Sequence, residues 1–187
     1  MSRALFAVTA ALLSAAQAVT LSGSVAGTPP AGARLGAWLV NAAGAPVSEF
    51  SSAPLSGAGF KLDLPDSAPG TRGQYPLRRE NIAWSGVLDP VTVSVPAVAA
   101  ELKFFVYPDA NANGRRDEGE ELTEVNVQAG KAGVLAVWVS DDTRVNAARG
   151  FEADLKRGWN LLSVELSKSS VKVAPLGNAS LRVNVGR

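Results

Sequence analysis

Apolar and polar residues alternate in short runs along most of the chain, and Gly, Pro, Asn and Asp separate the runs. The run 60–64, F-K-L-D-L, alternates without a break and stops at Pro65. A period of two puts successive side chains on opposite faces of a strand, so each run predicts a half-buried β-strand. About ten such strands indicate an all-β sandwich or barrel, and we expect an antiparallel β-sandwich. The expected strands are 19–25, 34–40, 60–64, 91–95, 101–107, 125–127, 134–140, 151–155, 159–166, 171–173 and 181–185.

Two stretches need separate interpretation. The run 134–140, V-L-A-V-W-V-S, is apolar almost throughout, which is typical of a central strand covered on both faces. The stretch 149–156, R-G-F-E-A-D-L-K, could also be helical. Because Phe151, Ala153 and Leu155 alternate with polar residues and a glycine follows, we expect a strand there.

The stretch 65–81 has no clear periodicity. It contains three prolines, two glycines and five charged residues, which predicts a long loop or a linker. The mature chain before this stretch is short for a sandwich that would be stable by itself. We expect 19–187 to form either one two-sheet unit crossed by this loop, or a small N-terminal lobe packed on a larger C-terminal β-sandwich.

The N-terminal residues 1–18 resemble a secretory signal peptide. Arg3 supplies a basic start, 4–13 is almost entirely apolar, and Ala16-Gln17-Ala18 is a small-x-small cleavage site. The apolar run is shorter than the roughly 20 residues of a transmembrane helix. We therefore expect cleavage after Ala18, a secreted mature protein in the periplasm or at the cell surface, and no transmembrane segment after cleavage.

The charge balance argues against a nucleic-acid partner. Without Arg3 the chain has 17 basic and 17 acidic residues, and its basic pairs are scattered among acids. Proteins that bind nucleic acids rely on clustered Lys and Arg to neutralise phosphates.

The chain contains neither cysteine nor histidine. Without cysteine, a secreted chain must be stabilised by its core or by bound ions rather than by disulfides. Without histidine, His-based acid–base catalysis, Ser-His-Asp or Cys-His nucleophiles and the usual zinc ligands are excluded. The sequence predicts no catalytic residues and favours a protein that is not an enzyme.

Residues 109–120, D-A-N-A-N-G-R-R-D-E-G-E, have the spacing of a calcium loop, D-x-[DN]-x-[DN]-G-x5-E. Alternate oxygen-bearing side chains can converge on one ion, Gly114 permits a sharp turn with positive φ, and the seventh residue offers its carbonyl. A turn without metal would use the same residue types but fewer residues. The expected Ca²⁺ ligands are Asp109, Asn111, Asn113, Arg115 (through its carbonyl), Asp117 and Glu120.

This segment resembles the EF-hand loop over its 12 residues, with two departures. The residues on either side are strand-like rather than helical, and Arg116 occupies a position that is apolar in paired EF-hands. The segment is more similar to the calcium loops set between strands in secreted bacterial β-sandwich modules, such as the B-type repeats of surface adhesins. That resemblance implies a structural ion that rigidifies a loop, not a calcium sensor.

A second, weaker resemblance covers about 45 residues near the N-terminus. The strands V-T-L-S-G-S-V at 19–25 and G-F-K-L-D-L-P at 59–65 are similar to those of transthyretin-like or carboxypeptidase-regulatory-like modules of secreted bacterial proteins. The resemblance implies an immunoglobulin-like or transthyretin-like sandwich with an accessory or interaction role, and it transfers no site residues.

Four tryptophans leave a carbohydrate-binding module as an alternative. Trp38 and Trp138 lie within apolar runs and are expected in the core, whereas Trp84 and Trp159 lie at strand edges. A hydrolase based on paired carboxylates is a third, less favoured reading, because the separation of such a pair is spatial. The leading hypothesis is a non-enzymatic structural or binding protein of a bacterial cell envelope, with other envelope or surface-layer proteins, or a glycan, as partners.

Overall fold

The computed structural model describes residues 19–57 and 59–185, so the expected signal peptide 1–18 lies outside the described residues. The chain is all-β, as predicted, with about fifteen strands rather than ten and three short 3-10 turns. The strands are β1 Val19–Ala26, β2 Ala33–Val40, β3 Pro46–Pro54, β4 Phe60–Leu64, β5 Tyr75–Pro76, β6 Thr92–Val93, β7 Val98–Pro108, β8 Thr123–Val125, β9 Val127–Ala129, β10 Ala132–Val139, β11 Thr143–Ala147, β12 Phe151–Leu155, β13 Gly158–Leu166, β14 Val171–Pro175 and β15 Leu181–Asn184. The 3-10 turns are η1 Thr71–Gly73, η2 Arg79–Asn81 and η3 Ala148–Gly150.

Twelve of the strands form one strongly curved sheet. Its main path is β3-β2-β7-β10-β9-β15-β1-β4, and β5, β8, β13 and β14 pair beside this path. The two ends of the path approach each other, where the Ser51 hydroxyl of β3 donates a hydrogen bond to the Asp63 carbonyl of β4 at 2.6 Å. The sheet is therefore nearly closed and barrel-like, and it is not specifically an immunoglobulin-like sandwich.

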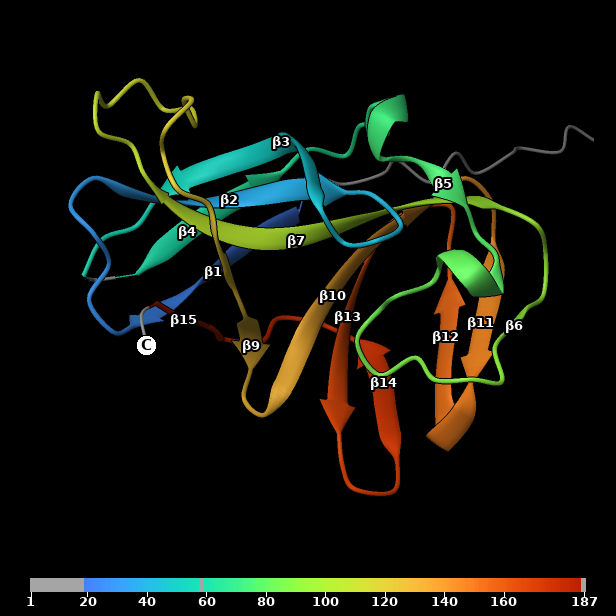
Figure 1. Cartoon of the computed structure of the whole chain (residues 1–187). Coiled ribbons are helices and arrows are strands. Elements are labelled where there is room, and N and C mark those ends of the chain that lie inside the picture. Colours follow the sequence, from blue (N-terminus) through green and yellow to red (C-terminus); the bar gives the residue numbers. More distant parts are fainter. Residues whose placement is uncertain (1–18, 58, 186–187) are drawn as a thin grey trace, which may run out of the picture.

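One strand pair breaks the antiparallel pattern. β1 runs parallel to β15, with Val25 opposite Val183, while β15 pairs antiparallel with β9. The first and last described strands are thus neighbours in the sheet (Figure 1). An antiparallel arrangement throughout was expected, but a parallel partner distant in sequence leaves no local signal.

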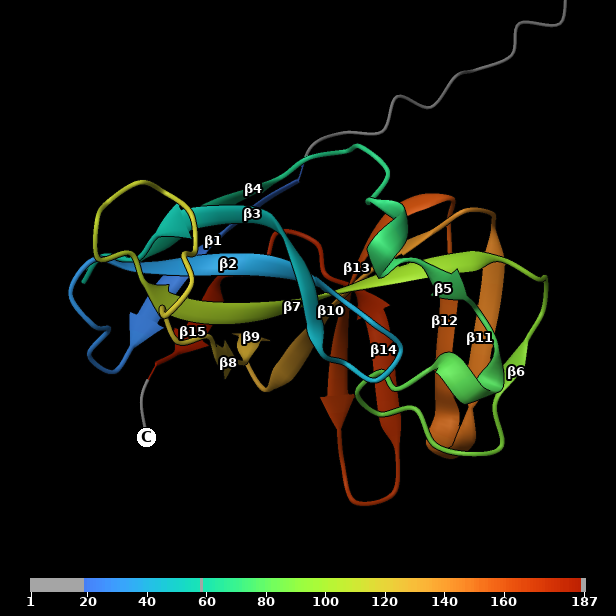
Figure 2. The ribbon, with the colours of Figure 1, turned by 45° about the horizontal axis from the view of Figure 1, so that its top comes forward.

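The remaining strands, β12, β11 and β6, form a small second sheet. It lies beside β13 and β14 and away from β1–β4 (Figures 1 and 2). A hydrophobic core joins β10, β13 and β14 to this small sheet and includes Val137, Val145, Phe151 and Leu155. A second core fills the curved sheet and includes Leu35, Leu62, Phe104 and Val183.

The alternating runs correspond closely to strands. β4 has the predicted bounds, and β12 is a strand rather than a helix, with Phe151, Ala153 and Leu155 buried and the residues between them exposed. β10 pairs with β7, β9 and β13, which confirms its central position. The expected strand 125–127 is wrong as a single element, because it divides between β8 and β9 around Asn126.

The loop 65–81 is more structured than its composition suggests. It contains η1, β5 and η2, and Tyr75 and Leu77 are buried. β5 pairs with β7, and strands from both sides of the loop share the curved sheet. The division of 19–187 into two lobes at this loop stays a prediction. No helix among the described residues is long and apolar enough to span a membrane.

Candidate metal centre

The loop 109–120 leaves the end of β7 and returns to β8, so it joins two strands, as the sequence predicted. It projects from one end of the curved sheet (Figures 1 and 2). The Asp109 amide donates to the Gly32 carbonyl in the turn between β1 and β2 at 3.1 Å. Immediately before the loop, the buried Tyr107 hydroxyl donates to Glu49 Oε1 of β3 at 2.7 Å, and burial raises the pKa of Tyr107 to about 12. The start of the loop is therefore anchored to two other segments.

The first and last acidic positions of the loop are held by backbone amides. Asp109 Oδ1 accepts from the Asn113 amide at 3.0 Å and Oδ2 accepts from the Gly114 amide at 2.9 Å. Glu120 Oε1 accepts from the Ala110 amide at 2.9 Å and Oε2 from the Asp117 amide at 2.8 Å. Both side chains are buried. Each carboxylate oxygen has a further lone pair, so these bonds fix the carboxylates and leave capacity for a cation.

Asp117 joins the two asparagines of the loop by hydrogen bonds. The side-chain amides of Asn111 and Asn113 both donate to Asp117 Oδ2 at 2.7 Å. Their oxygens accept from the amides two residues ahead, Asn111 Oδ1 from Asn113 at 3.1 Å and Asn113 Oδ1 from Arg115 at 2.8 Å. These oxygens also keep a second lone pair.

Gly114 has a φ of 80°, as expected for the sixth position of the loop. A Cβ there would come no closer than 3.9 Å to the Arg34 side chain, so the requirement is conformational and not steric. A glycine adopts positive φ without the penalty that other residues incur.

The carboxylates alone do not form a compact cluster. Within residues 19–57 and 59–185, no three Asp or Glu side chains gather as a metal-holding group. A cation in this loop would need the amide oxygens of Asn111 and Asn113 and the carbonyl of Arg115 as well. Calcium accepts such a mixed set of carboxylate, amide and carbonyl oxygens.

Two arginines contact the loop. Arg34 Nη1 of β2 lies 3.8 Å from Asp109 Oδ2, and the same guanidinium donates to Ser52 of β3 at 3.1 and 3.3 Å. Arg116 Nε donates to the Glu120 carbonyl at 2.9 Å, so its side chain folds back onto its own loop. The sequence could not identify Arg34, because it reaches the loop only through strand pairing.

The acidic residues outside the ligand positions, Glu118, Glu121 and Glu124, are exposed, as expected.

The four tryptophans differ in how far they are buried. Trp84 is 2% exposed, and its Nε1 donates to the Tyr75 hydroxyl at 3.1 Å, so its side chain belongs to the core. Trp38 is buried as expected, and Trp138 is partly buried against the core of the curved sheet. Trp159 is partly buried and packs on Phe50 with ring centroids 5.0 Å apart. Of the two edge tryptophans, Trp159 alone retains exposed surface for a ligand.

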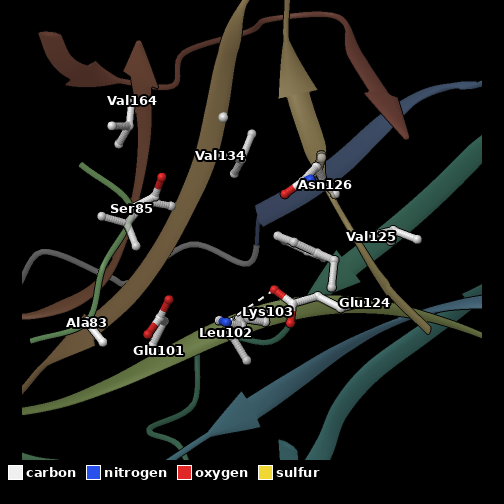
Figure 3. A pocket seen from close by; sticks show the side chains of 14 residues that line it. Ala83, Ser85, Glu101, Leu102, Lys103, Glu124, Val125, Asn126, Val134 and Val164 are labelled. Carbon is white, nitrogen blue, oxygen red and sulfur yellow. Dashed lines mark ion pairs between the residues drawn. The ribbon is translucent and has the colours of Figure 1, made fainter. Parts of the chain in front are cut away.

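A buried acidic residue was missed by the sequence reasoning. Glu101 of β7 is 7% exposed and lines a cavity together with Lys103, Glu124 and Asn126 (Figure 3). Burial raises the pKa of Glu101 to about 7, while the Lys103 ammonium lowers it and the Glu124 carboxylate raises it. A glutamate at an inward position of an apolar strand, A-A-E-L at 99–102, is the signal that could have identified it.

Comparisons of the chain with protein-family models, with curated proteins and with solved structures give no match.

Proposed function

We propose that this chain is a secreted, non-enzymatic structural or binding protein of a bacterial cell envelope, and that one Ca²⁺ ion stabilises its loop 109–120. The observation that carries the proposal is the hydrogen-bonded loop itself. Five oxygen-bearing side chains at the spacing of a calcium loop are tied together or to its backbone, around a glycine at positive φ.

The setting of the loop supports a structural ion. The loop joins β7 to β8 and carries no helix that could move on binding. Arg116 bonds to the Glu120 carbonyl of its own loop. An ion bound here would fix the connection between two strands, and in a chain without cysteine it would supply a cross-link of another kind.

The composition of the ligand set predicts weak affinity. Asp109, Asp117 and Glu120 supply three negative charges, and the Arg34 guanidinium lies beside the first of them. We expect a dissociation constant on the order of 10⁻⁵–10⁻³ M, the range of extracellular modules and weak sensors. Mg²⁺ should bind less well, because it holds its water shell and rarely accepts an all-protein cage.

For its partners we propose other envelope or surface-layer proteins. The resemblance of the N-terminal strands to transthyretin-like modules supports an interaction role for the strands β1–β4. A glycan remains the alternative partner, and a glycan array read with Trp159→Ala tests it. Trp84→Ala is unsuitable for that test because it removes a buried side chain.

The test of the metal site is a Ca²⁺ titration followed by thermal unfolding, with wild type, Asp109→Ala and Glu118→Ala. Calcium at 100 times its dissociation constant should stabilise the wild type by about 2.7 kcal/mol. Glu118→Ala, which removes an exposed carboxylate from a non-ligand position, should keep this gain, and Asp109→Ala should lose it. The comparison uses the calcium-dependent shift of each variant, because Asp109→Ala also removes two backbone contacts. An unchanged melting temperature in the wild type would refute the metal site.

A further inference from the structure

A cavity of about 260 Å³ lies where β7 and β10 part. The two strands pair as far as Leu102, whereas Phe104 of β7 pairs with Val125 of β8. β8 and β9 enter the widening gap, and the segment carrying Ala83 and Ser85 lies on the other side (Figure 3). The cavity therefore results from the sheet topology and does not depend on one side-chain conformation.

The Glu101 carboxyl group faces this cavity (Figure 3). Glu101 is only 7% exposed, none of the side-chain hydrogen bonds or ion pairs among the described residues involves its carboxyl group, and its oxygens stay open to the cavity. Lys103, two residues along the same face of β7, pairs instead with Glu124 Oε1 at 3.1 Å. A carboxyl group that is largely removed from bulk solvent and has no protein partner gains from a ligand that supplies one.

The charged residues that line the cavity determine which ligand charge fits. With Glu101 ionised, two glutamates face one lysine, so the cavity carries one net negative charge. An anion would approach two carboxylates, and a neutral apolar molecule would leave Glu101 unpaired. A single positive charge balances the wall and pairs with the buried carboxylate.

The apolar lining and the volume of the cavity limit the size and shape of the ligand. Val134, Leu135 and Val164 line the same cavity and supply apolar surface. The volume lies just below the usual range of small-molecule sites, roughly 300–1,000 Å³. A compact molecule with a cationic head and a short apolar body fits both properties.

We propose that this cavity is a binding site for a small organic monocation, an alkylammonium or alkylguanidinium, whose charged head pairs with Glu101 and whose apolar part contacts Val134 and Val164. The site is separate from the loop 109–120 and does not depend on calcium. It gives the fold a small-molecule ligand in addition to its structural role.

The test is an NMR titration of the full mature chain with n-butylammonium, using n-butanol as the neutral probe of similar shape. We expect saturable shifts of amides around the cavity, with at least roughly tenfold tighter binding of the ammonium than of the alcohol. Binding should also be about tenfold weaker at pH 6 than at pH 8, because Glu101 must be ionised while an alkylammonium stays charged at both pH values.

Three variants complete the test. Glu101→Gln keeps the shape and removes the charge, so it should weaken binding at least tenfold. Glu165→Gln removes an exposed carboxylate from β13 and should bind as the wild type does. Ser85→Phe places a large side chain at an exposed wall position and should block binding with Glu101 intact, which keeps the test available if Glu101→Gln does not fold.

The proposal is overturned if n-butanol binds as tightly as n-butylammonium, or if a folded Glu101→Gln binds as the wild type does. Shifts confined to residues outside the cavity overturn it too. So does the absence of saturable shifts up to roughly 100 mM, a concentration that detects very weak binding.

Discussion

Arg34 and Asp109 lie on separate segments, yet Arg34 Nη1 is 3.8 Å from Asp109 Oδ2. β2 and β7 are paired so that Arg34 stands opposite Tyr107, which directs the guanidinium toward the start of the loop. The same guanidinium is fixed by Ser52, whose hydroxyl donates to the Gly114 carbonyl at 3.4 Å. A positive charge is thus built into the surroundings of the proposed calcium site.

Removing that charge should strengthen calcium binding. In Arg34→Gln we expect the calcium dissociation constant to fall by roughly three- to tenfold, because a like charge near the ion is removed. Isothermal titration calorimetry measures this directly. The control is Arg72→Gln, an exposed arginine in η1, which should leave the constant unchanged. Weaker or equal binding in Arg34→Gln would show that the guanidinium does not act on the ion.

Gly114 and Gly70 allow the effect of a positive φ on stability to be measured by the same Gly→Ala substitution. Gly114 has a φ of 80° and Gly70 a φ of −60°, and neither Cβ would meet a close atom. We expect Gly114→Ala to lower the free energy of unfolding by about 1 kcal/mol, and Gly70→Ala to be neutral or to raise it by about 0.4–1 kcal/mol. Urea denaturation without calcium measures both. Equal effects of the two substitutions would contradict the conformational argument.

The pKa of Glu101 makes stability depend on pH. Its value is about 7 in the folded protein against 4.5 for a free glutamate. As pH rises between these values, the unfolded chain releases this proton while the folded protein keeps it, so stability falls with rising pH through that window. Glu101→Gln removes this loss, and its gain over the wild type should be roughly 2–3 kcal/mol larger at pH 8 than at pH 5.

Denaturant unfolding at the two pH values checks the Glu101 prediction. Glu165→Gln, at an exposed position, should show no such difference. A pH-independent difference between Glu101→Gln and the wild type would mean that the carboxyl group is solvated or paired in solution.

The hydrogen bond from Trp84 Nε1 to the Tyr75 hydroxyl should stabilise the core between the curved sheet and the small sheet. Both side chains are buried, so Tyr75→Phe leaves a buried indole donor without its acceptor. We expect a loss of about 1–3 kcal/mol in the free energy of unfolding. Tryptophan fluorescence during urea denaturation measures it. A loss below about 0.5 kcal/mol, the size of an ordinary surface substitution, would show that this bond is replaced by water.

The sequence predicts the fold best where burial imposes a period of two. β4 and β12 bury every second residue and have the expected bounds. β3 was not predicted, because it is an edge strand with Pro46 and Pro54 at its ends and half-buried polar residues between them. The expected strand 91–95 shortens to Thr92–Val93, and the backbone of Val95 bonds to the Thr143 hydroxyl in place of a strand backbone.

The two candidate sites differ in how far their residues lie apart in the sequence. The loop could be predicted because its groups lie within twelve residues, and their local hydrogen bonds follow from that spacing. Arg34, Glu101 and Glu124 gain their roles from strand pairings between distant segments. The periodicity of the sequence could therefore not predict which of these residues lie close together.

The parallel pairing of β1 with β15 has a consequence for the folding pathway. β15 is inserted between β1 and β9, and Leu181 lies opposite both Gly23 and Ala129. The curved sheet consequently cannot be completed before residue 184 has been synthesised. Pairings of such high sequence separation slow folding, because the loop between the partners must be closed first. The ribosome-bound chain therefore keeps β1 unpaired on this side throughout most of its synthesis.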